Sequence, residues 1–308
     1  MSASQSGVQP AGVQDLNTKT VTWKLVLART YELYAARFWT YFRIAIVPAV
    51  IAYVISYLWR IVIRQLVRAD FFPPFSGKWL AMVTALEWTR GAIYWTISAF
   101  FLAAIAATFG RDALKGPPAA ADAYTLLRMR MGAVAAVAVM IWTMFYIGRT
   151  ASSFAVLQLL NALHIGLQNF WVTTGAFAIP ILLLAGLLSK FGLAIPELMH
   201  NSSSSIRNAL KKSMKETAGW EVFFMVFLVK SAAIGYGIYW IAGQGLDWLW
   251  QHWTLNPNRF SWVEWSVYIF IAAVVETPLF IAFSVLYMEL QERRKPMTLL
   301  PPTNSHRL

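Results

Sequence analysis

Six long apolar runs dominate the sequence and constrain its fold more than any other feature. They cover roughly residues 44–59, 91–109, 132–147, 171–189, 222–241 and 265–288. A helix needs about 20 apolar residues to cross the hydrocarbon layer of a bilayer, so the short third run depends on tilt or on its flanking residues. Helices are favoured because they satisfy all backbone hydrogen bonds within the segment itself. The sequence therefore predicts an all-α membrane protein with six transmembrane helices.

The composition agrees with lipid as the main solvent. Hydrophobic residues make up 58% of the 308 residues and charged residues only 13%, about half the charged fraction of a typical soluble domain. The net charge is +12, which in a soluble protein would suggest nucleic acid as a partner. Here the basic residues flank the apolar runs, and no nucleic-acid-binding motif accompanies them. We therefore predict anionic membrane lipids as partners, and no nucleic acid.

The chain reads as one transmembrane domain, residues 21–295, between two polar ends. Residues 1–20 lack the apolar core of a cleaved signal peptide, and residues 296–308 include two adjacent prolines. Both ends are expected to be disordered. The absence of cysteine excludes disulfides, cysteine-ligated metals and a thiol nucleophile.

The distribution of Lys and Arg predicts that both chain ends face the cytoplasm of a bacterial inner membrane. Most basic residues lie in the two end segments and in the loops after the second and fourth runs. Arg60, Arg64 and Arg68 are the exception, because they follow the first run. Their four-residue spacing places them on one helix face, which suits a helix that continues past the hydrocarbon with its arginines on headgroup phosphates.

Residues 154–170 permit two interpretations. The segment is apolar, but Asn161, His164, Gln168 and Asn169 make it more polar than the six runs. We predict an interfacial or partly re-entrant segment on the outer side. The alternative is a seventh span, which would move the basic C-terminus outside.

Three basic amphipathic segments each lead directly into an apolar run. They cover residues 23–42, 119–131 and 205–219. Because each is followed by two spans, the sequence predicts three helix-pair repeats in the same orientation. The alternative is that any inside loop carries basic residues, with no repeat implied.

The third of these segments is the clearest candidate for a lipid-surface helix. Ile206, Leu210 and Met214 share one face and are expected to dip into lipid. The candidate contacts to lipid headgroups are Arg207, Lys211 and Lys215.

Two charged residues lie within the apolar runs. Lys230 is midway between Trp220 and Trp240, and Glu276 is midway along the last run. A lone charge at the bilayer centre costs at least ~3 kcal/mol, so a shared environment is expected for two charges at the same depth. Three interpretations stay open: a structural clasp between two helices, a site for a substrate, ion or proton, or independent placement with Lys230 reaching the interface.

Two prolines, Pro180 and Pro278, fall inside apolar runs and are expected at kinks. Proline is tolerated there when a neighbouring group satisfies the carbonyl that it frees. Thr277 adds a hydroxyl group and Pro278 adds a freed backbone carbonyl near Glu276, which favours a cavity there.

Enzyme signatures are weak. Glu197 and His200 share a helical face at a spacing used by ferritin-like metal sites, but a metal needs further ligands, and no second such pair is present. Ser202 to Ser205 reads as a linker ending in a helix N-cap. No P-loop, dinucleotide fingerprint or catalytic triad spacing occurs. We therefore predict no catalytic residues, no metal and no cofactor.

Three loose motifs resemble a known family. They are Tyr31–Trp39 leading into Ile44–Pro48, Phe191–Pro196 followed by Ala209–Ser213, and Leu286–Leu290 before Arg293 and Arg294. Together they resemble a bacterial family of integral membrane proteins that is best known as the membrane domain joined to some glycerophosphodiester phosphodiesterases. The resemblance implies a six-helix bundle in a bacterial inner membrane. We expect no phosphodiesterase activity, because the sequence shows no catalytic domain of that kind.

Two functions remain after these exclusions. The first is a non-enzymatic scaffold or accessory protein that uses its basic surface helices to bind lipids or a membrane-protein partner. The second is a transporter of small solutes or lipids built around Lys230 and Glu276. A continuous cavity that reaches this pair would favour transport, and a sealed pair would favour the scaffold.

Overall fold

The computed structural model describes residues 23–68, 76–109, 120–162, 170–201, 203–252 and 257–294. The secondary structure of these residues is helical. The expected disordered ends at 1–20 and 296–308 lie outside these residues. In chain order the elements are α1 (Trp23–Ala36), α2 (Phe38–Arg68), α3 (Gly77–Ala107), α4 (Ala120–Ala162), α5 (Phe170–Phe191), α6 (Ala194–His200), α7 (Ile206–Thr217), α8 (Glu221–His252), α9 (Pro257–Ile271), the π-helical turn η3 (Ala272–Glu276) and α10 (Thr277–Arg294).

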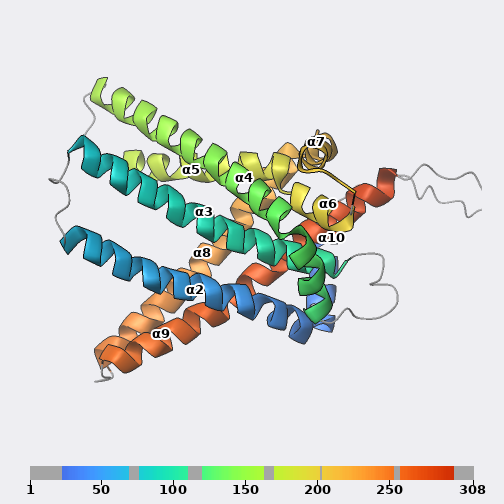
Figure 1. Cartoon of the computed structure of the whole chain (residues 1–308), viewed down its shortest axis with the longest axis horizontal. Helices are drawn as coiled ribbons and strands as arrows, with labels where there is room; N and C mark the ends of the chain where they lie inside the picture. Colours follow the sequence, from blue (N-terminus) through green and yellow to red (C-terminus); the bar gives the residue numbers. More distant parts are fainter. Residues whose placement is uncertain are drawn as a thin grey trace, which may run out of the picture.

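Within the described residues, six stretches are long and apolar enough to cross a membrane, which confirms the six-helix architecture. They are Phe38–Leu66, Gly77–Ala107, Ala120–Val156, Ile179–His200, Glu221–Trp250 and Trp265–Gln291. Successive spans run in opposite directions, so α1 and the end of α10 lie at the same end of the bundle (Figure 1).

The helices are longer than the apolar runs that identify them. For example, α2 has 31 residues and α4 has 43, whereas about 20 residues span the hydrocarbon layer. Their ends therefore extend into the headgroup layers. α2 continues through Arg60 and Arg64, whose side chains are exposed, to Arg68, as the four-residue spacing predicts.

Two of the expected segments belong to one helix in the structure. The second amphipathic segment leads directly into its span as expected, because α4 runs without a break from Ala120; a run rich in Ala, Leu and Met offers no helix stop signal there. The first half of the segment predicted to be interfacial, residues 154–162, forms the last turns of α4, where the candidate span ends at Val156, and its interfacial position stays a prediction. Residues 163–169 lie outside the described part.

The other two lead-in segments do form separate helices. α1 ends at Ala36, and one residue separates it from the start of α2. α7 begins after Ser205, whose Oγ accepts a hydrogen bond from the Asn208 backbone N–H at 3.3 Å, confirming the N-cap. Ile206 and Leu210 pack against the protein core, so the expected lipid-facing surface of α7 is partly used for packing. The threefold repeat stays a prediction.

α3 lies at the centre of the bundle, where it contacts α2, α4, α6 and α10. Its second half is rich in buried alanine: Ala99, Ala103, Ala104, Ala106 and Ala107. Small side chains let neighbouring helices approach closely in a membrane. Gly91 serves the same purpose, since a Cβ there would lie 1.8 Å from the Trp142 ring, and that ring is fixed by a 2.9 Å hydrogen bond from its Nε1 to the Trp88 carbonyl.

Two tyrosines satisfy backbone carbonyls beside prolines. Pro48 within α2 has no N–H to donate to the Ile44 carbonyl, four residues earlier. The Tyr124 hydroxyl of α4 donates to that carbonyl at 2.6 Å. In the last span, the Tyr34 hydroxyl of α1 donates at 3.4 Å to the carbonyl of Val274, four residues before Pro278. These bonds connect α4 to α2 and α1 to the η3 turn.

The Tyr124 bond should be needed only because of Pro48. Tyr124→Phe is expected to lower the free energy of unfolding by about 1–2 kcal/mol, because membrane hydrogen bonds rarely exceed this. Pro48→Ala restores a backbone donor to the Ile44 carbonyl. In a Pro48→Ala background, thermal unfolding in detergent should therefore show little effect of Tyr124→Phe. Equal losses in both backgrounds would contradict this assignment.

Candidate functional site

Two adjoining cavities surround Glu276 inside the bundle. The larger, which we call the apolar chamber, has a volume of about 530 Å³. The smaller, which we call the tyrosine chamber, has a volume of about 250 Å³. They share four lining residues, so they lie side by side: Tyr94, Ser98, Tyr239 and Glu276.

Glu276 reaches this position because of the π-helical turn. η3 ends at Glu276, and α10 starts at the next residue. A π turn adds one residue to a helical turn, which changes the direction of the side chains that follow, and such turns often mark functional sites. Thr277 donates its hydroxyl to the Ala273 carbonyl, which stabilises the turn beside Pro278.

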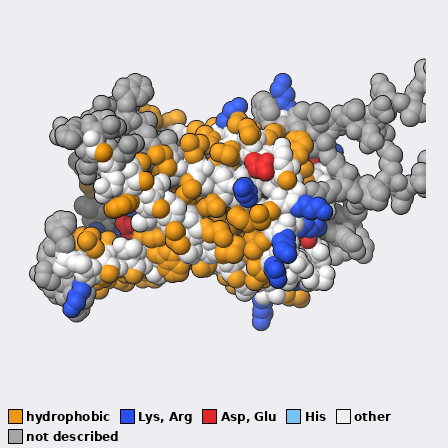
Figure 2. Space-filling model, turned by 90° about the horizontal axis from the view of Figure 1, so that it is seen from above, with side chains coloured by type: hydrophobic (Ala, Val, Ile, Leu, Met, Phe, Trp, Pro, Cys, Tyr) orange, Lys and Arg blue, Asp and Glu red, His pale blue; other side chains and the backbone are white. Residues whose placement is uncertain are grey.

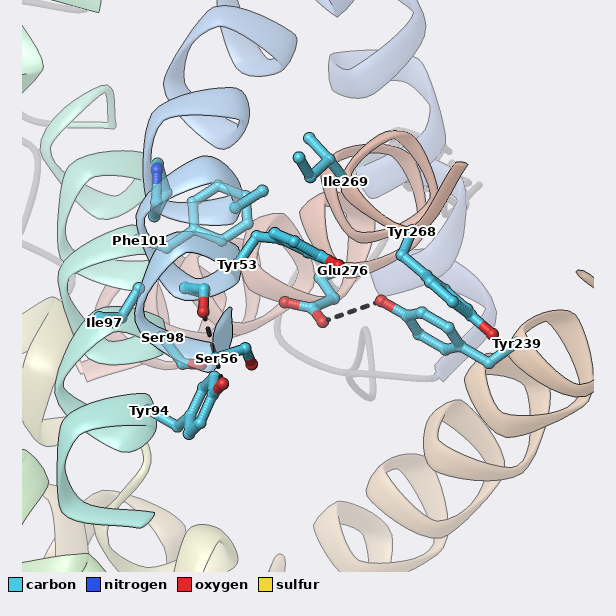
Figure 3. Close-up of a pocket in the computed structure, with 13 residues that line it drawn as sticks. Tyr53, Ser56, Tyr94, Ile97, Ser98, Phe101, Tyr239, Tyr268, Ile269 and Glu276 are labelled. Carbon is cyan, nitrogen blue, oxygen red and sulfur yellow. Dashed lines mark hydrogen bonds between the residues drawn. The ribbon is translucent and has the colours of Figure 1, made fainter. Parts of the chain in front are cut away.

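The tyrosine chamber is built from four spans. α2 contributes Tyr53 and Ser56, and α3 contributes Tyr94 and Ser98 one helical turn apart. Tyr239 comes from α8, and Tyr268 comes from α9. Figure 3 shows the Glu276 side chain between Tyr53 on one side and Tyr239 with Tyr268 on the other.

Hydroxyl groups supply the polar contacts in this chamber. Tyr239 donates to Glu276 Oε1 at 3.4 Å, and Tyr94 donates to the Ala52 carbonyl at 3.4 Å. The rings of Tyr239 and Tyr268 stack with their centroids 6.1 Å apart. The carboxyl group therefore lies among aromatic rings and hydroxyls at membrane depth.

The apolar chamber lies between α8 and the centre of the bundle. Near its start, α8 packs on α10 through Phe224 and Phe227 against Phe283. Further along, Tyr239 stacks on Tyr268 of α9. Between these contacts, Leu228, Ile234 and Gly235 line the chamber, opposite Trp95, Ala99 and Leu102 of α3.

The chamber has a mouth on the outer surface of the bundle. Leu27 of α1 and Ile234 of α8 both line the chamber, yet they are 41% and 65% exposed. Ile234 lies on a candidate spanning helix, whose exposed surface faces lipid rather than water, and Leu27 lies on the short helix α1 at the end of the bundle. The mouth therefore opens sideways toward the bilayer.

The structure places the two charges expected to pair in different surroundings. Glu276 lines both chambers, whereas the Lys230 side chain is exposed on α8. Lys230 follows Glu221, the first residue of α8, by nine residues, about 14 Å along the helix, so in this helix of 32 residues it is nearer to the middle than to either end. The partner shown for Glu276 is Tyr239, and the pairing with Lys230 stays a prediction.

A double-mutant cycle tests that pairing. If the two side chains are partners, Lys230→Met and Glu276→Gln should each lower the thermal stability in detergent. Replacing both by apolar residues should then recover much of the loss, since breaking a buried pair from one side costs about 3–5 kcal/mol. Additive losses would contradict the pairing.

A second polar cluster, which we call the polar clasp, connects α6 and α7 with α10. Glu197 is 1% exposed, and Lys212 Nζ lies 2.6 Å from its Oε2. Tyr287 donates its hydroxyl to the same carboxylate. Lys212 also lies 3.9 Å from Glu216, which accepts a hydrogen bond from Gln291.

The clasp uses the Glu197 carboxylate for structural contacts. His200, its expected neighbour on the helix, has Nδ1 2.9 Å from the Pro196 carbonyl. Within the described residues, no group of three or more His, Cys, Asp or Glu side chains could hold a metal ion. The candidate headgroup contacts Arg207, Lys211 and Lys215 are exposed on α7, and their contact with lipid stays a prediction.

Lys212 should matter for stability far more than its neighbour Lys211. Lys212→Met leaves the buried Glu197 without its ammonium partner, and we expect a loss of about 2 kcal/mol. This is less than for a fully buried pair, because the Lys212 side chain is 36% exposed. Lys211→Met, the matched control, should change the unfolding temperature little. Equal effects of the two variants would contradict the clasp.

Sequence reasoning singled out Glu276 but missed the tyrosine chamber. Tyr94 and Ser98 lie four residues apart inside an apolar run and so share one face of a helix. This spacing was the one sign in the sequence of a polar surface within the bundle. Tyr53, Tyr239 and Tyr268 come from three other helices, and only their packing brings them together.

The chain matches no known protein-family model, and comparisons with curated proteins and with solved structures also find no match. The resemblance to the membrane domain of glycerophosphodiester phosphodiesterases therefore stays a prediction.

Proposed function

We propose that this integral membrane protein takes a lipophilic molecule from the bilayer into the apolar chamber, as a transporter of lipids or lipid-like solutes. One observation carries the proposal: an intramembrane chamber of about 530 Å³ whose mouth is lined by the exposed side chains of Leu27 and Ile234. Its volume is typical of ligand sites, which are mostly apolar with a few well-placed polar groups.

The position of Glu276 favours transport over the scaffold. In a scaffold, Glu276 would serve only as a structural contact between helices, and its carboxyl group would then need closely packed side chains around it and no cavity. Instead, two cavities reach the carboxyl group, and its hydrogen-bond partner Tyr239 lines both. The described lining residues offer one carboxyl with several hydroxyls, and no histidine or lysine stands beside it to form an acid–base pair.

The basic surface of α7 supports the scaffold as a second candidate. Arg207, Lys211 and Lys215 are exposed, and a basic residue near an anionic bilayer surface contributes about 1 kcal/mol to binding. This surface can hold the protein on anionic headgroups, or on a membrane-protein partner, whether or not the chamber is used.

We propose further that the end with α1, α7 and α10 faces the cytoplasm of a bacterial inner membrane. On the face seen in Figure 2, most Lys and Arg side chains gather toward this end, and apolar side chains cover the middle of the molecule. An excess of Lys and Arg on the cytoplasmic side is the general rule. The family resemblance points to the same membrane.

Reporter fusions test this orientation. Fusions placed after Lys115 and after Arg294 should both report the cytoplasm, because an even number of spans separates them. A periplasmic signal at Arg294 would contradict the orientation.

The chamber itself can be tested by filling it. A hexadecanol analogue with a diazirine near its chain end, photoactivated in lipid nanodiscs, should label chamber residues such as Trp95 and Leu102. Gly235→Phe should reduce this labelling at least threefold, since Gly235 lines the chamber. Peptide mass spectrometry locates the labelled residues.

Gly237→Phe on the same helix is the matched control. A Cβ at Gly237 meets nothing within 4 Å, and Gly237 does not line either chamber, so labelling should stay at the wild-type level. The proposal fails if wild-type labelling is confined to the outer surface, or if both variants label like wild type.

A further inference from the structure

The tyrosine chamber combines one carboxyl group with several aromatic rings. Tyr53, Tyr94, Tyr239, Tyr268 and Phe101 line it together with Glu276 (Figure 3). The face of an aromatic ring carries partial negative charge and attracts cations, most strongly in sites shielded from water. Sites that recognise ammonium groups often combine such rings with an anionic side chain.

The described side chains that line the two chambers include a negative charge but no positive charge. Among the described residues that line either chamber, Glu276 is the one charged side chain, and none is Lys, Arg or His. A buried carboxylate is stabilised by a cation, which a ligand can supply here. An anionic ligand would meet the same carboxylate without a compensating basic group in the lining.

The two chambers also differ in the part of a ligand that each fits. The apolar chamber is lined by side chains such as Trp95, Leu102, Ile141, Leu188 and Phe280, which suit a hydrocarbon chain. The tyrosine chamber, at about 250 Å³, suits a compact head group. Glu276 lies at the boundary and can contact a head group whose chain extends toward the mouth.

We propose that the ligand is an amphiphilic amine, with its ammonium group in the tyrosine chamber beside Glu276 and its hydrocarbon part in the apolar chamber. This inference rests on the proposed function, because it names the class of lipophilic molecule that the chamber takes. The aromatic rings and the carboxyl group select the cation, and the apolar chamber selects the chain.

The test compares three probes with the same chain and different heads: dodecyltrimethylammonium, dodecanol and dodecyl sulfate. Each competes with the uncharged diazirine hexadecanol probe for the full-length protein in nanodiscs of zwitterionic lipid. Competition is expressed per mole fraction of probe in the bilayer, which corrects for partitioning. The ammonium probe should compete at a concentration at least tenfold below that of dodecanol, and dodecyl sulfate should be the weakest.

Glu276→Gln should remove this preference, so that the ammonium probe competes no better than dodecanol on the same variant. Glu87→Gln, which changes an exposed carboxylate on α3, is the control and should behave as wild type. Tyr268→Leu provides a second variant if Glu276→Gln does not fold; it removes one ring and should reduce the ammonium preference several-fold.

The outcomes separate this inference from the function on which it rests. If dodecanol competes as well as the ammonium probe, or if Glu276→Gln keeps the preference, the amine assignment is wrong and the lipophilic chamber stands. If dodecyl sulfate is the best competitor, the ligand class is anionic and the assignment is overturned. If no probe competes and chamber residues are never labelled, the proposed function fails as well.

Discussion

Every backbone N–H and carbonyl within the hydrocarbon layer must find its partner inside the protein, and much of this structure follows from that constraint. Long helices satisfy most of these groups, but Pro48 and Pro278 each leave a carbonyl without its usual donor. Tyr124 and Tyr34, from other helices, supply hydroxyls to those positions. Because these donors come from α4 and α1, satisfying the backbone also determines which helices lie together. The η3 turn beside Pro278 then directs Glu276 into the bundle.

The bundle is closely packed around α3 and contains open space beside α8. Around α3, small side chains allow α4, α6 and α10 to approach, and Gly91 accommodates the Trp142 ring. α8 packs against α5, and aromatic contacts near Phe227 and again at Tyr239 attach it to the last span. Between these contacts its side chains line the apolar chamber instead of filling it. The chamber therefore results from where α8 is attached, and Glu276 provides its one charged wall among the described lining residues.

The six spans could be predicted from the sequence, because hydropathy reports the solvent that each residue prefers and lipid imposes a minimum length. The depth of Glu276 follows from the same argument. The direction of a side chain around its helix does not follow from hydropathy. Lys230 is exposed on α8, and its pairing with Glu276 stays a prediction. The polarity of the sequence changes at 119–131 and at 154–162, but these changes do not mark helix ends, because α4 runs from Ala120 to Ala162. The tyrosine chamber was beyond sequence reasoning, since Tyr53, Tyr94, Tyr239 and Tyr268 converge only when four helices pack.

The most direct test of the central claim, that a molecule from the bilayer occupies the apolar chamber, is an electron cryo-microscopy map of the protein in lipid nanodiscs. The structure predicts elongated density that enters between Leu27 and Ile234 and extends toward Glu276, with Gly235 beside it. The same density should be displaced in Gly235→Phe and retained in Gly237→Phe. A map in which the part of α8 from Leu228 to Gly235 packs directly on α3, with side chains filling the space around Ser98 and Leu102, would contradict the claim.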